Sequence, residues 1–129
     1  MNQEKDLFLR MLTFFLQKLA EKLSEKPIAE ITDLEMEDFY LTALKSERNN
    51  IMHLNKEALE NECRIENKFS IEKCRIMAEL FYIEANRITD DARRKYAEKS
   101  LYLFEKYLQA SKTFDFDVAK KVDELKSLI

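Results

Sequence analysis

His53 is the only histidine in the sequence. Any catalytic triad or two-histidine metal site would therefore have to be completed by another chain. The Glu-x-x-His motif of di-iron helical bundles would need an acid three residues before His53, where Asn50 stands instead. The chain contains no glycine, so a glycine-rich phosphate loop is excluded as well. We expect no metal and no cofactor.

Cys63 and Cys74 are the only cysteines, and both lie in stretches that are predicted to be helical. Cys74 belongs to an apolar stripe, which is typical of a small core residue and a poor position for a nucleophile. A chain of this length does not need a disulfide to be stable, so we expect reduced thiols and a cytoplasmic location.

Arg48 and His53 are separated by four residues and could together act on a phosphodiester. A guanidinium binds phosphate through two hydrogen bonds, and histidine exchanges protons near neutral pH. The segment from Arg48 to His53, RNNIMH, resembles the Arg-x4-His signature of HEPN ribonucleases, in which an asparagine such as Asn49 often follows the arginine. The resemblance implies a metal-independent site shared by two subunits. There His53 would be the acid/base that lets the ribose 2′-hydroxyl attack, and Arg48 would hold the phosphate.

A structural explanation of the same residues is equally simple. Arg48 would end the second predicted helix, where a cation complements the helix dipole, and His53 would be an ordinary linker residue. The acidic and basic residues are interleaved along the chain and give a net charge of −3. This balance does not favour binding to nucleic acid or to anionic lipid.

Composition indicates an all-α protein in a single domain, residues 1–129. Apolar residues make up 46% and charged residues 36% of the chain, and there is one proline. The lack of glycine argues against a β-hairpin, whose turn favours residues at positive φ. The apolar run of residues 7–16 is interrupted by Arg10 and is too short to span a membrane. Residues 1–6 carry two acids where a signal peptide would be basic, so we expect no export by that route.

Apolar spacing and capping residues predict five or six helices, mostly antiparallel neighbours. Their approximate ranges are 4–24, 33–50, 55–67, 70–88, 91–110, and from 115 or 117 to the end. Thr32 and Glu35 form a capping box, and Asn55 and Ser70 can cap the helices that follow them. The hairpin of about 70–110 should form the central layer. The predicted core comprises Phe15, Leu19, Phe39, Leu44, Phe81, Ala85, Leu101, Phe104, Val122 and Leu125.

The first predicted helix is apolar over more of its circumference than a surface helix needs. Either the rest of the domain or a second chain must cover it. Phe8, Phe14 and Phe15 are therefore the candidate partner-binding residues, and self-association through this helix into a homodimer is a further expectation.

Two predicted helices in residues 70–108 resemble a tetratricopeptide-like hairpin, because small residues on them face large ones. The small residues are Ala78, Ala85 and Ala97, and the large ones are Phe81, Leu101 and Phe104. Segments 6–11, 68–73, 78–82 and 112–116 also resemble a group of uncharacterised bacterial proteins built on such a hairpin. The resemblance implies that the chain binds a protein partner and that its last helix caps the open face of the hairpin.

The sequence thus predicts a non-catalytic protein-interaction module that binds neither nucleic acid nor membrane. The alternative function is a HEPN-type ribonuclease that uses Arg48, Asn49 and His53.

Overall fold

The computed structural model describes residues 2–129, with side chains described from Leu7 onward. In this part of the chain there are seven α-helices, one short 3-10 helix and one two-stranded hairpin. The elements are α1 Asn2–Glu25, η1 Ile28–Glu30, α2 Asp33–Leu44, α3 Arg48–Met52, α4 Lys56–Glu62, β1 Arg64–Ile65, β2 Lys68–Phe69, α5 Ile71–Arg87, α6 Ala92–Ser111 and α7 Phe116–Lys126. The prediction of a mainly helical protein is confirmed. Over the described residues, no helix is both long enough and apolar enough to cross a membrane.

The second predicted helix is divided in two, which raises the helix number above the five or six expected. Helix α2 ends at Leu44, and Lys45 takes a left-handed backbone conformation with φ 55°. The Lys45 N–H closes the helix end by donating to the Leu41 carbonyl at 3.1 Å. Asn49 and Asn50 therefore lie inside the separate helix α3, and the prediction that they end the second helix was wrong.

A β-hairpin occupies the region where the third predicted helix was expected to continue to residue 67. Helix α4 stops at Glu62, and β1 and β2 pair in antiparallel fashion around Glu66 and Asn67. These two residues have φ of 52° and 65°, the left-handed conformations that a tight hairpin turn requires. The Ser70 N–H donates to the Cys63 carbonyl at 2.7 Å and closes the hairpin. The prediction that a chain without glycine forms no β-hairpin was therefore wrong at this position.

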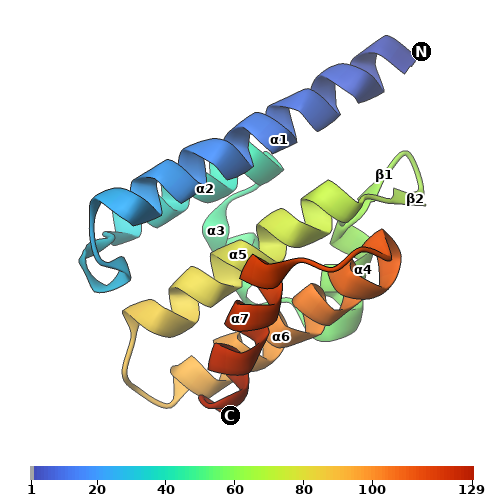
Figure 1. Ribbon diagram of the computed structural model, residues 1–129. Coiled ribbons are helices and arrows are strands. Elements are labelled where there is room, and N and C mark those ends of the chain that lie inside the picture. The colour runs from blue at the N-terminus through green and yellow to red at the C-terminus, as the bar shows by residue number, and fades with distance from the viewer. Residues whose placement is uncertain (1) are drawn as a thin grey trace.

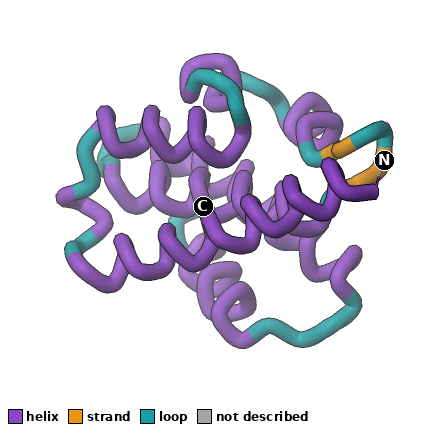
Figure 2. Tube along the Cα trace, turned by 90° about the horizontal axis from the view of Figure 1, so that it is seen from above, coloured by secondary structure: helices purple, strands orange, loops and turns teal. Residues whose placement is uncertain are grey.

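Helix α5 lies at the centre of the molecule (Figure 1). Helices α1 and α2 and the turn η1 pack on one side of it, and α6 packs along another side as the second arm of a hairpin. Small buried residues, among them Ala78 and Ala97, permit this packing, and the Ser100 hydroxyl donates to the Ala78 carbonyl at 2.7 Å. Seen from above, the β1–β2 hairpin lies at the edge of the helical bundle (Figure 2).

The helix caps predicted from residue type are present. Thr32 and Glu35 form the capping box, with the Thr32 hydroxyl accepting from the Glu35 N–H at 3.1 Å. The side chains of Asn55, Ser70 and Asp115 cap α4, α5 and α7. Local side-chain chemistry therefore sets where most of the helices begin.

Eight of the ten predicted core residues are buried, and the two exceptions are informative. Phe39 and Leu101 are only half-buried. Leu103, rather than Leu101, is fully buried on α6, because the inward face of this helix is rotated relative to the predicted one. Phe39 lies on α2 at a surface that the rest of the described chain leaves open.

Replacing Phe81 by alanine tests the central position of α5. Phe81 is 0% exposed, so Phe81→Ala should lower the free energy of unfolding by about 3–5 kcal/mol through lost burial and the resulting cavity. Phe116 is 82% exposed, and Phe116→Ala should change it by well under 1 kcal/mol. Urea unfolding followed by circular dichroism measures both variants. Equal effects of the two substitutions would contradict this packing.

Candidate functional site

An apolar groove runs between α1 and α2. Its floor and walls enclose a cavity of about 260 Å³. The lining side chains that matter most here are Phe8, Met11, Phe14, Phe15, Phe39 and Ala43. The three phenylalanines that the sequence indicated as candidates for partner binding, Phe8, Phe14 and Phe15, therefore line one and the same surface. Phe39 and Ala43 complete it from α2, and sequence reasoning did not assign them to a site.

The three candidates contribute to the groove in different ways. Phe15 is 7% exposed and packs edge-to-face on Phe39, with ring centroids 6.2 Å apart. Phe8 is half-buried, whereas Phe14 is 57% exposed. Phe15 thus forms the floor of the groove, and Phe14 offers a ring to a ligand.

The rim of the groove carries charges of both signs. Lys18, Asp38 and Lys45 border the apolar surface. The Lys18 ammonium lies 5.2 Å from the Phe14 ring centroid and 3.7 Å from the Glu21 carboxylate. A separate hollow beyond Lys18 is lined largely by charged residues, among them Glu21, Lys22 and Glu25. An apolar surface with a mixed polar rim is the usual form of a groove that receives a helix.

Glu35, at the start of α2, holds the C-terminal end of α1 in place beside that helix. Its carboxylate pairs with Lys22 at 3.1 Å and with Lys26 at 2.6 Å, and it also accepts the Thr32 N–H at 3.0 Å. The hydrogen bond from Lys26, followed by those from Thr32 and Lys22, lowers the pKa of Glu35 from 4.5 to about 2. The wall formed by α1 is therefore fastened to α2 by a charged contact as well as by apolar packing.

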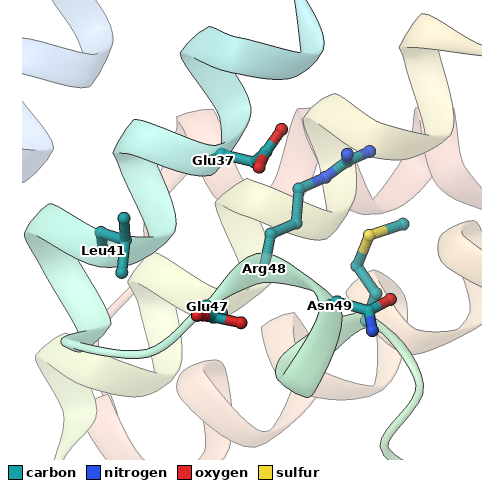
Figure 3. Close-up of a pocket in the computed structure, with 6 residues that line it drawn as sticks. Glu37, Leu41, Glu47, Arg48 and Asn49 are labelled. Atoms are coloured by element: carbon teal, nitrogen blue, oxygen red, sulfur yellow. The ribbon is translucent and has the colours of Figure 1, made fainter.

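A second hollow, of about 390 Å³, lies beside α3 and contains Arg48 (Figure 3). Glu37, Glu47 and Asn49 are among its lining residues. The two carboxylates make this hollow unfavourable for a phosphate group because like charges repel. Arg48 is the first residue of α3, so the expectation that it ends the second helix was wrong.

The Arg48 guanidinium is already engaged by a buried acid. Its Nε and one terminal nitrogen donate to the two Glu84 carboxylate oxygens at 2.7 and 2.9 Å. Glu84 is 0% exposed and also accepts from Tyr40 and Arg87. Glu84 was not identified from the sequence, because a single acid in the apolar pattern of α5 gives no sign of partners found 36 and 44 positions away. In this arrangement, Arg48 acts as a structural counter-ion.

His53 is exposed at the C-terminal end of α3. Its Nε2 lies 2.9 Å from the Asn49 side-chain oxygen, so these two members of the Arg-x4-His motif are in contact. Arg48 shares no hydrogen bond with either of them and contacts Glu84 instead. Within one chain, only the asparagine and the histidine of the Arg-x4-His motif are therefore in contact.

Cys63 and Cys74 are free thiols buried in the core. The Cys74 thiol donates to the Leu103 carbonyl at 3.2 Å. The neighbouring Cys63 thiol, together with burial, raises the pKa of the Cys74 thiol, which opposes formation of the reactive thiolate. Among the described side chains, no cluster of three or more histidine, cysteine or acidic residues could hold a metal ion.

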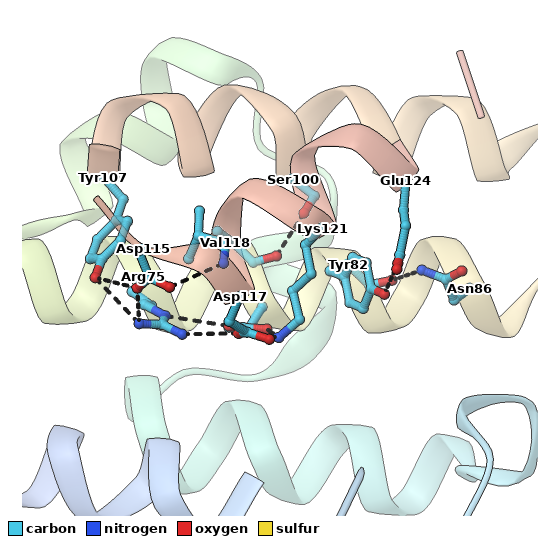
Figure 4. Close-up of polar contacts among 12 residues, drawn as sticks. Arg75, Tyr82, Asn86, Ser100, Tyr107, Asp115, Asp117, Val118, Lys121 and Glu124 are labelled. Atoms are coloured by element: carbon cyan, nitrogen blue, oxygen red, sulfur yellow. Dashed lines mark hydrogen bonds and ion pairs between the residues drawn. The ribbon is translucent and has the colours of Figure 1, made fainter. Parts of the chain in front are cut away.

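A charged network fastens α7 to α5 (Figure 4). The Arg75 guanidinium donates to Asp115 at 2.8 Å and to Asp117 at 3.2 Å, and the Lys121 ammonium donates to the buried Glu79 carboxylate at 2.7 Å. These groups satisfy one another, so the network is explained by the attachment of α7 and leaves little capacity for a ligand.

Comparisons with protein-family models, with curated proteins and with solved structures found no match to this chain.

Acid should weaken the contact that fastens α1 to α2. Because the pKa of folded Glu35, about 2, lies below its ordinary value of 4.5, its ion pairs stabilise the fold above about pH 4.5 and are lost as the pH falls toward 2. Glu35→Gln should therefore give a shallower dependence of the unfolding free energy on pH between those values. Glu37→Gln, which alters an exposed acid on the same helix, is the matched control. Equal pH profiles for the wild type and Glu35→Gln would refute the assignment.

His53 separates the two function classes in one assay. We expect purified protein to leave single-stranded RNA intact in the absence of metal, and His53→Ala to alter the unfolding free energy by well under 1 kcal/mol, as for most exposed residues. A cut that disappears in His53→Ala would overturn the interaction interpretation. Arg48→Ala is unsuitable for this assay. It leaves the buried Glu84 carboxylate without its Arg48 partner and should lower the free energy of unfolding by about 3–5 kcal/mol.

Proposed function

We propose that this protein is a non-catalytic protein-interaction module whose α1–α2 groove binds an amphipathic helix. The observation that carries the proposal is the combination of an open apolar groove with exposed large side chains beside it. Leu7, Met11 and Phe14 on α1 are 58%, 45% and 57% exposed. A contiguous exposed apolar patch of this kind marks an interaction surface more often than a solvated one.

The dimensions of the groove fit a helical ligand. Its lining residues on α1 run from Phe8 to Lys18, a rise of about 15 Å at the usual helical spacing. A ligand helix of about three turns covers that length. Such a helix would present apolar residues at three- and four-residue spacing to the phenylalanine floor and polar residues to Lys18, Asp38 and Lys45 on the rim.

The state of the buried ionisable groups supports a non-catalytic role. Glu84 is fully engaged by Tyr40, Arg48 and Arg87, and within the described residues every buried side-chain nitrogen or oxygen has a hydrogen-bond partner. Catalytic acids and bases are instead held with a proton or lone pair available to substrate. The mixed-sign rim supports a protein ligand over nucleic acid.

A tetratricopeptide-like relationship and a cytoplasmic location belong to the same proposal. The α5–α6 hairpin supports the former, because Ala78, Ala85 and Ala97 are all 0% exposed beside the buried rings of Phe81 and Phe104. Helix α7 packs on α6 and would act as the capping helix of such a unit. The buried free thiols support a reducing compartment.

Site-specific photocross-linking tests the groove directly. A benzophenone amino acid in place of Phe14 should cross-link a helical segment of a protein partner in native extract. The same probe in place of Phe116, which is 82% exposed on α7, is the matched control and should give no such product. Mass spectrometry identifies the cross-linked peptides. Products from position 116 and none from position 14 would refute the assignment of the groove.

A further inference from the structure

Helix α1 exposes an apolar ridge along the edge of the groove, and two ridge residues, Met11 and Phe14, also line the groove. Leu7, Met11 and Phe14 follow one another at spacings of four and three residues, so they lie along one face of the helix. The ridge has the anchor pattern by which an amphipathic helix fills an apolar groove. Groove and candidate ligand are thus present on the same chain.

Building on the proposed function, we propose that the helix bound by the groove is α1 of a second copy of this chain. The two α1 helices pair in antiparallel orientation about a twofold axis near Met11. Each copy lays its ridge along the groove of the other, so the same surface is used twice.

The order of residues in the ridge is what makes it self-complementary. Met11 is followed three residues later by Phe14 and preceded four residues earlier by Leu7. In an antiparallel pair centred on Met11, residues equally far from Met11 face each other, so Leu7 faces the partner's Phe15 and Phe14 faces the partner's Phe8, both of which line the groove, while Met11 faces the partner's Met11. A parallel pair would instead place each ridge residue opposite its own copy and leave both grooves unfilled, and antiparallel pairing also opposes the two helix dipoles favourably.

The lengths of the two helices leave room for a second copy. Helix α1 has 24 residues and α2 has 12, so α2 can cover only part of α1. The buried side chains Leu12, Phe15 and Leu19 face the body of the protein, whereas the ridge does not. Within the described residues, no element of the chain covers the ridge.

Charge on the groove rim permits this pairing. Asp38 and Lys45 are the acid and the base on the α2 side, and neither forms an ion pair within the described residues. Lys18 is compensated by Glu21. Two identical rims of mixed charge can approach without the repulsion that a surface of one sign would generate.

The available area is small and fits a weak association. The three ridge side chains expose roughly 300 Å² in each chain, which is comparable to the largest apolar patch on a typical monomer. With the groove walls included, a twofold interface would bury about 1,000–1,200 Å², at the lower limit for specific association. We therefore expect a dissociation constant on the order of 1–100 µM.

Sedimentation equilibrium from about 1 to 500 µM, a range chosen to bracket that constant, measures the association. Wild type should shift from the monomer mass of 15.4 kDa toward twice that value. Met11→Glu and Phe14→Glu should each weaken dimerisation at least tenfold, because a carboxylate would have to be buried at the interface. Both positions are about half exposed, so circular dichroism should show the fold retained. Leu34→Glu is the matched control, because Leu34 is 78% exposed on α2 outside the groove and should leave dimerisation unchanged.

Disulfide formation tests whether the twofold axis of the dimer passes near residue 11. Met11→Cys should form an interchain disulfide under mild oxidation, since the two copies of residue 11 meet at the axis, whereas Leu34→Cys should not. The native cysteines are buried and do not compete. A wild-type monomer at the highest concentration, or an unweakened Met11→Glu dimer, would overturn the proposal.

The outcomes also separate this inference from the proposed function. A monomeric wild type whose position 14 cross-links a different protein would refute self-pairing and leave the groove as an interaction site. A dimer that persists in both glutamate variants, with no cross-link from position 14, would refute both.

Discussion

A single buried carboxylate, that of Glu84, determines how the N-terminal half of the chain attaches to the central helix. Removing a carboxylate from water costs several kcal/mol unless donors replace the lost hydration. Tyr40, Arg48 and Arg87 supply those donors from α2, α3 and α5. Arg87 also donates to the Ile31 carbonyl at 2.9 Å and so ties the segment before α2 to the same cluster. Because α2 forms one wall of the groove, the shape of that groove depends on a charge on α5.

Helix α5 uses a second buried carboxylate in the same way on the side of α7. Glu79 accepts from Lys121 at 2.7 Å and pairs with Arg75, which in turn binds acids at the start of α7. Helix α1 has no ion pair to α5 among the described side chains, and its charged contact to its neighbours runs from Lys22 to Glu35 on α2. Helix α1, which carries part of the candidate site, is thus held mainly by apolar packing and by one partly exposed ion cluster. The side chains on its outer face take no part in these contacts.

Features set by adjacent residues could be predicted from the sequence, whereas features set by distant partners could not. The capping residues Thr32 and Ser70 mark helix starts because their side chains bind N–H groups three positions away. The excess apolar width of the first helix predicted that some of its apolar side chains would stay at the surface, since apolar residues all around a helix exceed what one side can bury, and Phe14 is 57% exposed. The role of Glu84 and the groove wall at Phe39 arise only when helices far apart in the sequence meet. The apolar periodicity of a single helix cannot predict contacts with residues far away in the sequence.

The absence of glycine has a consequence for the energetics of the chain as a whole. Four described residues, Lys45, Glu66, Asn67 and Lys112, adopt left-handed conformations that glycine would take without steric cost. For residues with a Cβ that conformation costs about 1 kcal/mol each, and somewhat less for asparagine. Without glycine, however, the unfolded ensemble samples fewer backbone conformations, so the chain loses less entropy when it folds. The free-energy cost of these left-handed residues, which lie in three turns, is therefore opposed by the lower conformational entropy of an unfolded chain that lacks glycine.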